Sequence, residues 1–512
     1  MERTIMEDNL IFYFALCLLI LITSKLLLQT RSRFKKLPPS PPSLPILGNL
    51  LQLKQPLHSH LHSLSQKYGP IFSLRLGSRF AVVVSSPSAV EECFTKNDII
   101  FANRVPLHKT KYIGYNNTVL VASSYGDHWR NLRRISSLEI LSTARINSFL
   151  NLRVDETKLL LRKLARQSKN NFAKVELRSM FSDLTFNTIM RMVAGKRYYG
   201  DEADLTNVEE AKRFRDAMQE ISSFSLGTKD SNLVDFLPLF RWIDYNGYKK
   251  RLQRVGKTLD ELLQGLIDEH RYKKEGLEST NTLIDHLLIS QESEPEYYTD
   301  KIIKGLIMVL ILAGTDTSAI TLEWAMSYLL NYPRVLDKAR IELEAQVGEG
   351  RLVEEADVTK LSYLKSIISE TMRLSPAAPM LVPHMASDDC FVGGYDVPRG
   401  TMLLVNAWAI HRDPDLWTDA LIFKPERFEN EEGEARKLIP FGMGRRACPG
   451  AGLAQRTVGL TLASLIQCFD WKRVSDLKID MRESGGGLMP KAIPLEVQCK
   501  ARPILSKILS QP

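Results

Sequence analysis

The stretch of sequence that decides the fold is Phe441-Gly442-Met443-Gly444-Arg445-Arg446-Ala447-Cys448-Pro449-Gly450. An apolar run with helical spacing, Leu453 to Phe469, follows it, so Cys448 lies in a glycine-rich loop at the start of a helix. There the sulfur faces free backbone N–H groups and the positive end of the helix dipole, and both stabilise a thiolate relative to a thiol. Iron requires a thiolate of a cysteine ligand, so the loop predicts that Cys448 binds a metal.

The residues around Cys448 suit a flat macrocycle that carries the metal. Phe441 can shield the sulfur from water, the glycines let the backbone approach closely, and Arg446 can pair with a carboxylate on the edge of the macrocycle. The alternative is a buried cysteine on a tight turn that binds nothing. That interpretation fits Cys93 or Cys468 better than Cys448.

The loop resembles the signature of the cytochrome P450 family, Phe-x-x-Gly-x-Arg-x-Cys-x-Gly, which is met by Phe441, Gly444, Arg446, Cys448 and Gly450. The resemblance extends over nearly the whole chain. It implies a mainly α fold with a small β-sheet portion and a single large catalytic domain. It also implies haem b as the cofactor, with Cys448 as the axial thiolate and the rest of the signature in the cofactor site.

Glu370 and Arg373 form a Glu-x-x-Arg motif in a stretch with helical spacing. Residues three apart meet on one helix face, and alone such a pair is an everyday surface feature. Its position ahead of the cysteine loop resembles the Glu-x-x-Arg motif of the family, whose buried triad Arg427 would complete. The resemblance implies a structural role for Glu370, Arg373 and Arg427.

Small residues interrupt the long apolar stretch from Asp300 to Leu330, in the segment Ala313-Gly314-Thr315-Asp316-Thr317-Ser318. Glycine lowers the stability of a helix, and small side chains leave space beside it. A run of such residues in the middle of a helix therefore suggests a functional reason for their presence. The resemblance implies that it lies over the haem, where Thr317 and Asp316 relay protons to the dioxygen that is reduced. The alternative is a helix kink with a back-bonded threonine.

Further positions match the family at the haem edge. Trp129 and Arg133 resemble its Trp-x-x-x-Arg, whose spacing puts both side chains on one helix face, and the resemblance implies that they hold a propionate. His384 matches a position that contacts the other propionate, although an ordinary surface histidine is the alternative. If the fold repeats, a mostly apolar substrate pocket is lined by the segment from Phe101 to Ser123 and by Leu310, Ala313, Ala377, Val382 and Leu488.

Composition narrows the partners. The chain has 512 residues and a net charge of +9, but its charges interleave without a basic stripe, which argues against a nucleic-acid partner. Six scattered cysteines do not form a disulfide framework. The chain contains no Gly-x-Gly-x-x-Gly after a strand, no P-loop and no flavin signature, so it cannot take electrons from NADPH itself. The resemblance implies NADPH-cytochrome P450 reductase as the electron donor.

The N-terminus predicts a membrane anchor. Leu10 to Ile22 is an unbroken apolar run, and counted to Leu28 it approaches the ~20 residues that span a bilayer. We expect a transmembrane signal anchor at residues 1–30, a basic and proline-rich linker at 31–48, and the haem-binding domain at 49–512. Acidic residues precede the run and basic residues follow it, which leaves the domain in the cytosol. Resemblance to plant microsomal members implies that the chain passes once through the endoplasmic reticulum membrane and has membrane lipid as a partner. The alternative is that the apolar run belongs to a cleaved signal peptide.

Periodicity predicts the main elements of the body. Apolar residues at spacings of three to four predict helices at residues 154–167, 216–226, 248–274, 300–330 and 361–374. A β-hairpin is expected from residues 71–76 and 81–84, and short strands are expected around 390–392 and 402–405.

The proline-rich linker and the segments Ala313 to Ser318 and Asn406 to Pro414 most resemble plant microsomal members of the family. Within these, Ala447 to Ala454 resembles the group with isoflavone hydroxylases and lignan methylenedioxy-bridge enzymes. This implies a monooxygenase that uses O2 and NADPH-derived electrons to hydroxylate or ring-close a hydrophobic specialised metabolite of the flavonoid or isoflavonoid, lignan or triterpenoid class. Two alternatives remain open. One is a reductase-independent haem-thiolate isomerase or dehydratase, whose members commonly lose the acid-threonine pair. The other is a non-catalytic haem-binding membrane protein.

Overall fold

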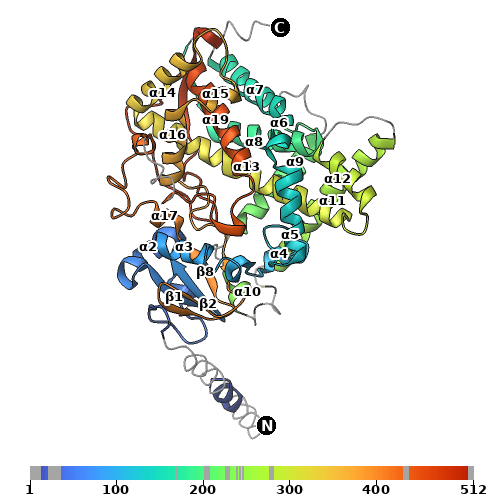
Figure 1. Cartoon of the computed structure of the whole chain (residues 1–512), viewed down its shortest axis with the longest axis vertical. Helices are drawn as coiled ribbons and strands as arrows, with labels where there is room; N and C mark the ends of the chain where they lie inside the picture. The colour runs from blue at the N-terminus through green and yellow to red at the C-terminus, as the bar shows by residue number, and fades with distance from the viewer. Residues whose placement is uncertain are drawn as a thin grey trace, which may run out of the picture.

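The structure is a computed structural model that describes residues 13–20, 36–168, 171–200, 208–224, 231–237, 240, 244, 247–275, 282–429 and 437–505. A large helical region and a smaller region that holds the main sheet make up the body (Figure 1). The prediction of a mainly α fold with a small β portion is confirmed.

The helices of the first half precede the long central helix in the chain. They are α2 (Leu57–Tyr68), α3 (Pro87–Phe94), α4 (His108–Tyr112), α5 (Asp127–Arg134), α6 (Thr143–Ser148), α7 (Leu150–Ser168), α8 (Leu177–Ala194), α9 (Val208–Ser223), α10 (Ser231–Phe236), α11 (Tyr248–Glu275) and α12 (Leu283–Ser293). The later helices are α13 (Asp300–Asn331), α14 (Pro333–Gln346), α15 (Glu355–Val358), α16 (Ser362–Leu374), α17 (Ala407–Ile410) and α19 (Ala451–Cys468). Helices α7, α9, α11, α13 and α16 confirm the five predicted helices, although α9 begins eight residues earlier than expected.

Helix α13 is the structural centre of the helical region (Figure 1). The Thr299 side chain caps its start by accepting the N–H of Ile302, and most of its residues are buried because apolar side chains occur all round it. It packs against α8 and α19. Within the described residues it is the one helix long and apolar enough to cross a membrane, and 61% of that apolar stretch is buried inside the body.

The small residues in the middle of this helix do not end it. Residues 313–318 continue α13 without a break. The Thr315 and Thr317 hydroxyls donate to the carbonyls of Ile311 and Ala313, one turn earlier, so the threonines are accommodated within helical geometry. The back-bonded threonine of the alternative interpretation is therefore present, in a helix that continues through the segment.

The main sheet has five strands in the order β1-β2-β8-β5-β3. These are β1 (Ile71–Leu76), β2 (Arg79–Val84), β3 (Asn103–Arg104), β5 (His384–Met385) and β8 (Met402–Val405). The predicted hairpin is confirmed by β1 and β2, and β8 lies parallel to β2. At the far edge, Arg104 of β3 pairs with His384 of β5, which places both residues beside the helical region.

Two smaller sheets complete the β structure. One has the order β4-β10-β9, with β4 (Ala173–Glu176), β9 (Phe469–Arg473) and β10 (Glu496–Ala501). The other pairs β6 (Cys390–Val392) with β7 (Tyr395–Val397). The predicted strands at 390–392 and 402–405 are thereby confirmed as β6 and β8.

The described part of the expected linker, residues 36–48, lies against the body. Ser73 of β1 donates from its backbone N–H to Pro39 and from its hydroxyl to Pro38, at 2.8 and 2.9 Å. Gly48 forms an isolated bridge to Leu76. Of the expected anchor, only residues 13–20 are described; they are helical and exposed, and the rest lies outside the described residues.

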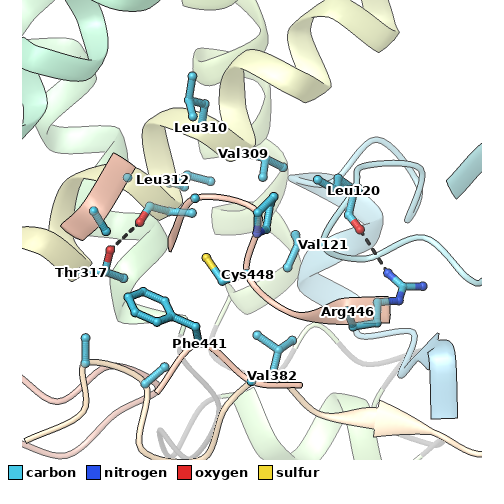
Figure 2. Close-up of a pocket in the computed structure, with 18 of the residues that line it drawn as sticks. Leu120, Val121, Val309, Leu310, Leu312, Thr317, Val382, Phe441, Arg446 and Cys448 are labelled. Carbon is cyan, nitrogen blue, oxygen red and sulfur yellow. Dashed lines mark hydrogen bonds between the residues drawn. The ribbon is translucent and has the colours of Figure 1, made fainter. Parts of the chain in front are cut away.

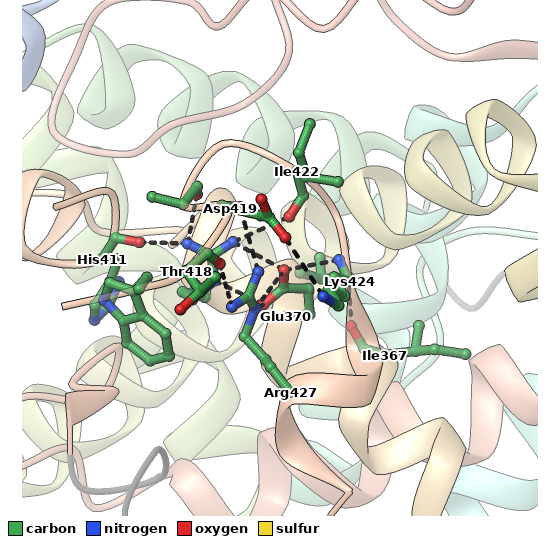
Figure 3. Close-up of polar contacts among 12 residues, drawn as sticks. Ile367, Glu370, His411, Thr418, Asp419, Ile422, Lys424 and Arg427 are labelled. Atoms are coloured by element: carbon green, nitrogen blue, oxygen red, sulfur yellow. Dashed lines mark hydrogen bonds and ion pairs between the residues drawn. The ribbon is translucent and has the colours of Figure 1, made fainter. Parts of the chain in front are cut away.

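The structure brings Glu370, Arg373 and Arg427 together in the core (Figure 3). Arg373 forms a two-pronged pair with Glu370 at 2.6 and 2.8 Å, and the Nε of Arg427 approaches the same carboxylate at 3.0 Å. Arg373 also donates to the backbone carbonyls of His411 and Ala420. The triad therefore fastens α16 to the long segment that leads to the cysteine loop.

We predict that Arg373→Ala lowers the free energy of unfolding by about 3–5 kcal/mol, because Glu370 and Arg373 are both 0% exposed and the substitution leaves a buried carboxylate short of a partner. Denaturant unfolding of the purified protein measures the effect. The matched control is Lys174→Ala, which removes an exposed pair with Glu496 and should cost at most about 1 kcal/mol. Equal losses in the two variants would contradict a structural role for the triad.

Candidate active site

A cavity of about 640 Å³ lies between α13, α5, the residues before β5 and the cysteine loop. Its size is in the range of small-molecule sites, and its lining is mostly apolar. The five expected pocket residues all line it: Leu310, Ala313, Ala377, Val382 and Leu488. Figure 2 shows Cys448 with its sulfur pointing into this space, beside Phe441 and facing the side of α13 that carries Thr317.

Cys448 is held at the cavity wall by its own loop. Its backbone N–H donates to the Phe441 carbonyl at 2.8 Å, which closes the loop, and α19 begins three residues later. Burial raises the pKa of the Cys448 thiol, whereas the backbone N–H groups of Gly450 and Ala451 and the charge of Arg133 lower it. The expected N–H groups at the helix start are therefore present, although burial outweighs them in this protein without a bound metal.

The other buried cysteines lie in a different environment. Cys93 and Cys468 pack inside hydrophobic clusters, and burial raises the pKa of Cys468 to about 12. Cys448 is the cysteine that opens on the cavity among the described residues. This separates it from the inert buried cysteines, as the sequence predicts.

Gly444 is expected in the cofactor site, but it does not face the cavity lined by the other residues of the motif. It is absent from the described lining of the cavity, and its backbone has φ +67°. A Cβ there would lie 2.4 Å from Oδ1 of Asp98 and 2.9 Å from the Phe94 carbonyl, so a side chain is excluded by both conformation and space. Asp98 also accepts the backbone N–H of Arg445 at 3.1 Å. Gly444 therefore fastens the cysteine loop to the end of α3 rather than facing a macrocycle.

Three guanidinium groups line the cavity near the cysteine loop. Arg446 donates to the carbonyls of Ala102, Leu120 and Ser123, and its guanidinium lies 4.3 Å from the ring centre of Trp129. Arg133 donates to the Ala447 carbonyl at 2.7 Å. Arg104 donates to the carbonyls of Val382 and Pro383.

No carboxylate of the described residues forms an ion pair with these three arginines. Burial and then repulsion from Arg446 lower the pKa of Arg104 to about 9, and burial and then Arg133 lower the pKa of Arg446 to about 10. No aspartate or glutamate occurs among the described residues that line the cavity. Clustered arginines without a carboxylate require an anion from outside the chain, because buried charges need partners.

Buried donors without a hydrogen-bond partner also indicate that an anion binds here. The Nε1 of Trp129 and the Nε of Arg104 are buried and have no hydrogen-bond partner among the described residues. His384 donates from Nδ1 to the Phe101 carbonyl at 2.7 Å. Burial, Arg104 and Arg446 hold the pKa of His384 well below its usual value, and an anion placed among these groups would raise it.

These observations fit haem. A flat apolar macrocycle with two carboxylates would fill the apolar cavity beside the Cys448 sulfur, give Arg104 and Trp129 the acceptors they lack, and bring negative charge to Arg133 and Arg446. The site therefore has the donor set of a haem-thiolate protein.

Comparison with known proteins identifies the family within that class. The model of the cytochrome P450 family matches residues 38–498, and the chain belongs to this family. It is a haem-thiolate monooxygenase that receives its electrons from a separate reductase and acts on a hydrophobic substrate.

Curated plant relatives match over nearly their whole length. An isoflavone 2'-hydroxylase of Glycyrrhiza echinata is 56% identical over 479 residues, which cover 94% of this chain and 95% of the relative. An isoflavone 3'-hydroxylase of Medicago truncatula is 55% identical, with 98% and 99% covered. A (+)-piperitol/(+)-sesamin synthase of Sesamum radiatum is 53% identical, with 100% and 99% covered.

The two residues of the expected proton relay are placed differently. Thr317 lines the cavity, and its hydroxyl donates to the Ala313 carbonyl at 2.7 Å (Figure 2). Asp316 is half-buried on the same helix but is absent from the described lining of the cavity. Consecutive helical residues point about 100° apart, which separates the two side chains.

Arg104 lies in the segment from Phe101 to Ser123 that the sequence predicts as pocket lining, but the sequence assigns it no role of its own. Nothing local distinguishes an arginine that faces the cavity from one that faces water. Only the pairing of β3 with β5 shows that Arg104 lies opposite His384. Long-range strand pairing is not visible in a local pattern.

We predict that Trp129→Phe accelerates the loss of haem from the ferric protein by about tenfold, because it removes a buried N–H donor that is otherwise unpaired. Transfer of haem to excess apomyoglobin measures the rate. Trp471→Phe is the matched control, since the Trp471 N–H already donates to the Leu465 carbonyl and does not line the cavity. A rate unchanged in Trp129→Phe, or equal in both variants, would remove Trp129 from the haem site.

Proposed function

We propose that this protein hydroxylates or oxidatively ring-closes a plant aromatic metabolite of the isoflavonoid or lignan class at the cavity above Cys448. The observation that carries the proposal is a cysteine open to an apolar cavity of about 640 Å³ whose cationic edge lacks carboxylates. The relatives described above are named for isoflavones and for a lignan. We therefore retain these classes and not the triterpenoid class.

Each haem-binding residue has a defined task. Cys448 would bind the iron, and Phe441 would shield the sulfur next to it. Arg446, Arg133 and Trp129 would bind the propionates, together with Arg104, and His384 lies at the same edge. When bound, haem supplies the iron at which dioxygen is reduced.

Thr317 would position a proton on the substrate side. Its Oγ1 holds its own proton on the Ala313 carbonyl at 2.7 Å, which leaves the oxygen lone pairs directed away from that carbonyl to accept a donor in the cavity. Rotation of the hydroxyl can turn its own proton into the cavity, where it is given up as Oγ1 accepts a replacement proton from the donor. Asp316, one residue earlier, would take part only indirectly, by supplying protons from the neighbouring face of α13.

The apolar residues of the cavity would bind the substrate. Leu310 and Ala313 of α13, Ala377 and Val382 before β5, and Leu488 near the C-terminus surround the space next to Thr317. They exclude water and hold a hydrophobic substrate against the reacting side of the macrocycle.

The N-terminus would anchor the protein in the endoplasmic reticulum membrane. Residues 13–20 are helical and exposed, and large apolar side chains such as Phe14 (72% exposed) have no protein surface to cover them. Basic residues after the apolar run keep residues 49–512 on the cytosolic side, where the reductase and membrane lipid would be its partners. Residues 36–48 then connect the anchor to the body.

We predict that Thr317→Ala uncouples electron consumption from product formation and releases peroxide, with coupling reduced by about tenfold or more. Peroxide and product are measured per NADPH consumed in the presence of reductase. Thr315→Ala is the matched control, because Thr315 donates to a carbonyl one turn earlier on the same helix but does not line the cavity. Full coupling in Thr317→Ala would remove Thr317 from the proton relay.

Metabolite profiling under ¹⁸O2 tests the proposed function. Microsomes that contain this chain and reductase are incubated with flavonoids, lignans and triterpenes. Hydroxylation adds one ¹⁸O atom to the product and reduces the other to water. Ring closure of a methoxyphenol removes two hydrogens and reduces both oxygen atoms to water. In both cases NADPH supplies two electrons.

The alternatives give different results in the same experiment. Product that forms without reductase would establish the isomerase or dehydratase. Haem binding without oxygen consumption on any substrate would establish the non-catalytic protein. Either result would overturn the monooxygenase proposal.

A further inference from the structure

Lys109 is a charged side chain of the cavity that stands apart from the three arginines. It lies on α4, and its Nζ donates to the Phe224 carbonyl, just after α9, at 3.3 Å. Arg104, Arg133 and Arg446 instead bond to backbone around β5 and the cysteine loop. Two propionates account for the arginines, so the charge of Lys109 remains to be explained.

No carboxylate of the described residues forms an ion pair with Lys109. Asp235 of α10 is close enough to raise its pKa, but burial lowers that pKa by more. The Asp235 carboxylate instead accepts the backbone N–H of His108 at 2.5 Å. An ammonium has three donors, and among the described residues that of Lys109 uses one, in a single hydrogen bond of 3.3 Å.

The surroundings of Lys109 define what could bind there. Leu107, Ile113 and Ile221 line the same part of the cavity and are apolar. The hydroxyl of Thr110 donates to the Leu107 carbonyl at 2.8 Å, so it is already engaged. An oxygen acceptor on an otherwise apolar body matches this arrangement, because the residues around the ammonium are apolar apart from the engaged Thr110.

We propose that Lys109 is a specificity-determining residue that donates a hydrogen bond to a free phenol or phenolate oxygen at the end of the substrate remote from the reacting carbon. The inference rests on the proposed function and narrows its substrate to aromatic compounds with an unblocked hydroxyl at that end. In isoflavones oxidised at 2' or 3', the remote end is the unprimed ring system. A methyl ether there would lose the ionised form and crowd the ammonium.

Ligand binding to the ferric holoenzyme tests this without turnover. The probes are 7-hydroxyisoflavone and 7-methoxyisoflavone, and their dissociation constants are read from the haem difference spectrum. The wild type should bind the hydroxyl compound about tenfold more tightly than its methyl ether, the value of one charge-assisted hydrogen bond. Lys109→Met should bring the ratio close to one, and Lys109→Arg should retain most of it.

Lys111→Met is the matched control. Lys111 lies on the same helix, is exposed and has its ammonium 6.0 Å from the ring centre of Tyr112, so its removal should leave the ratio unchanged. If Lys109→Met fails to load haem, Lys109→Gln replaces it and should reduce the ratio severalfold, because a neutral amide is a weaker donor.

Three results would overturn the proposal. They are a wild-type ratio near one, no binding of either probe, and a ratio that survives in Lys109→Met or Lys109→Gln. The last result, with a lowered melting temperature, would instead assign Lys109 to a structural contact between α4 and the end of α9. Failure of the proposed function is measured separately. In that case the protein shows no reductase-dependent turnover, although the ratio of the two dissociation constants can still be measured.

Discussion

The open position of the Cys448 sulfur is the constraint on which the rest of the structure depends. The loop closes through the Cys448 N–H and the Phe441 carbonyl, and Gly444 fastens it to the end of α3 at a point where no side chain fits. Behind it, the triad of Glu370, Arg373 and Arg427 fixes the segment that leads into the loop. A movement of any of these parts would turn the sulfur away from the cavity.

Charge balance links this loop to the rest of the site. The arginines come from β3, α5 and the cysteine loop, and they meet around a space with no carboxylate in its described lining. Such an arrangement costs free energy until a dianionic ligand binds, so the body is built to be completed by its cofactor. On the proposed substrate side of the cavity, Lys109 is likewise a cation without an ion-pair partner among the described residues, and Leu107 and Ile113, which line the cavity near it in the chain, are apolar.

Much of this could be predicted from local sequence. The cysteine loop, the triad residues and Thr317 belong to motifs whose spacing is itself informative, and amphipathic helices such as α11 match their periodicity from end to end. Helix α8 was not predicted, because residues buried on nearly all sides leave no polar stripe to show a helical period. Arg104 and Lys109 lie in the segment from Phe101 to Ser123 that is expected to line the pocket, but the sequence assigns neither a role. An arginine or lysine usually faces water, and strand pairing and packing bring these two to the cavity. The unbroken course of α13 through its small residues likewise depends on packing against α8 and α19.

The most direct test of the central claim is the absorption spectrum of the reduced carbon monoxide complex, recorded for the wild type and for Cys448→Ser. The account predicts a thiolate-type, red-shifted Soret band in the wild type and its loss in the variant, with Cys468→Ser behaving as the wild type because Cys468 is buried away from the cavity. A red-shifted band that persists in Cys448→Ser would show that another residue binds the iron and would contradict the account.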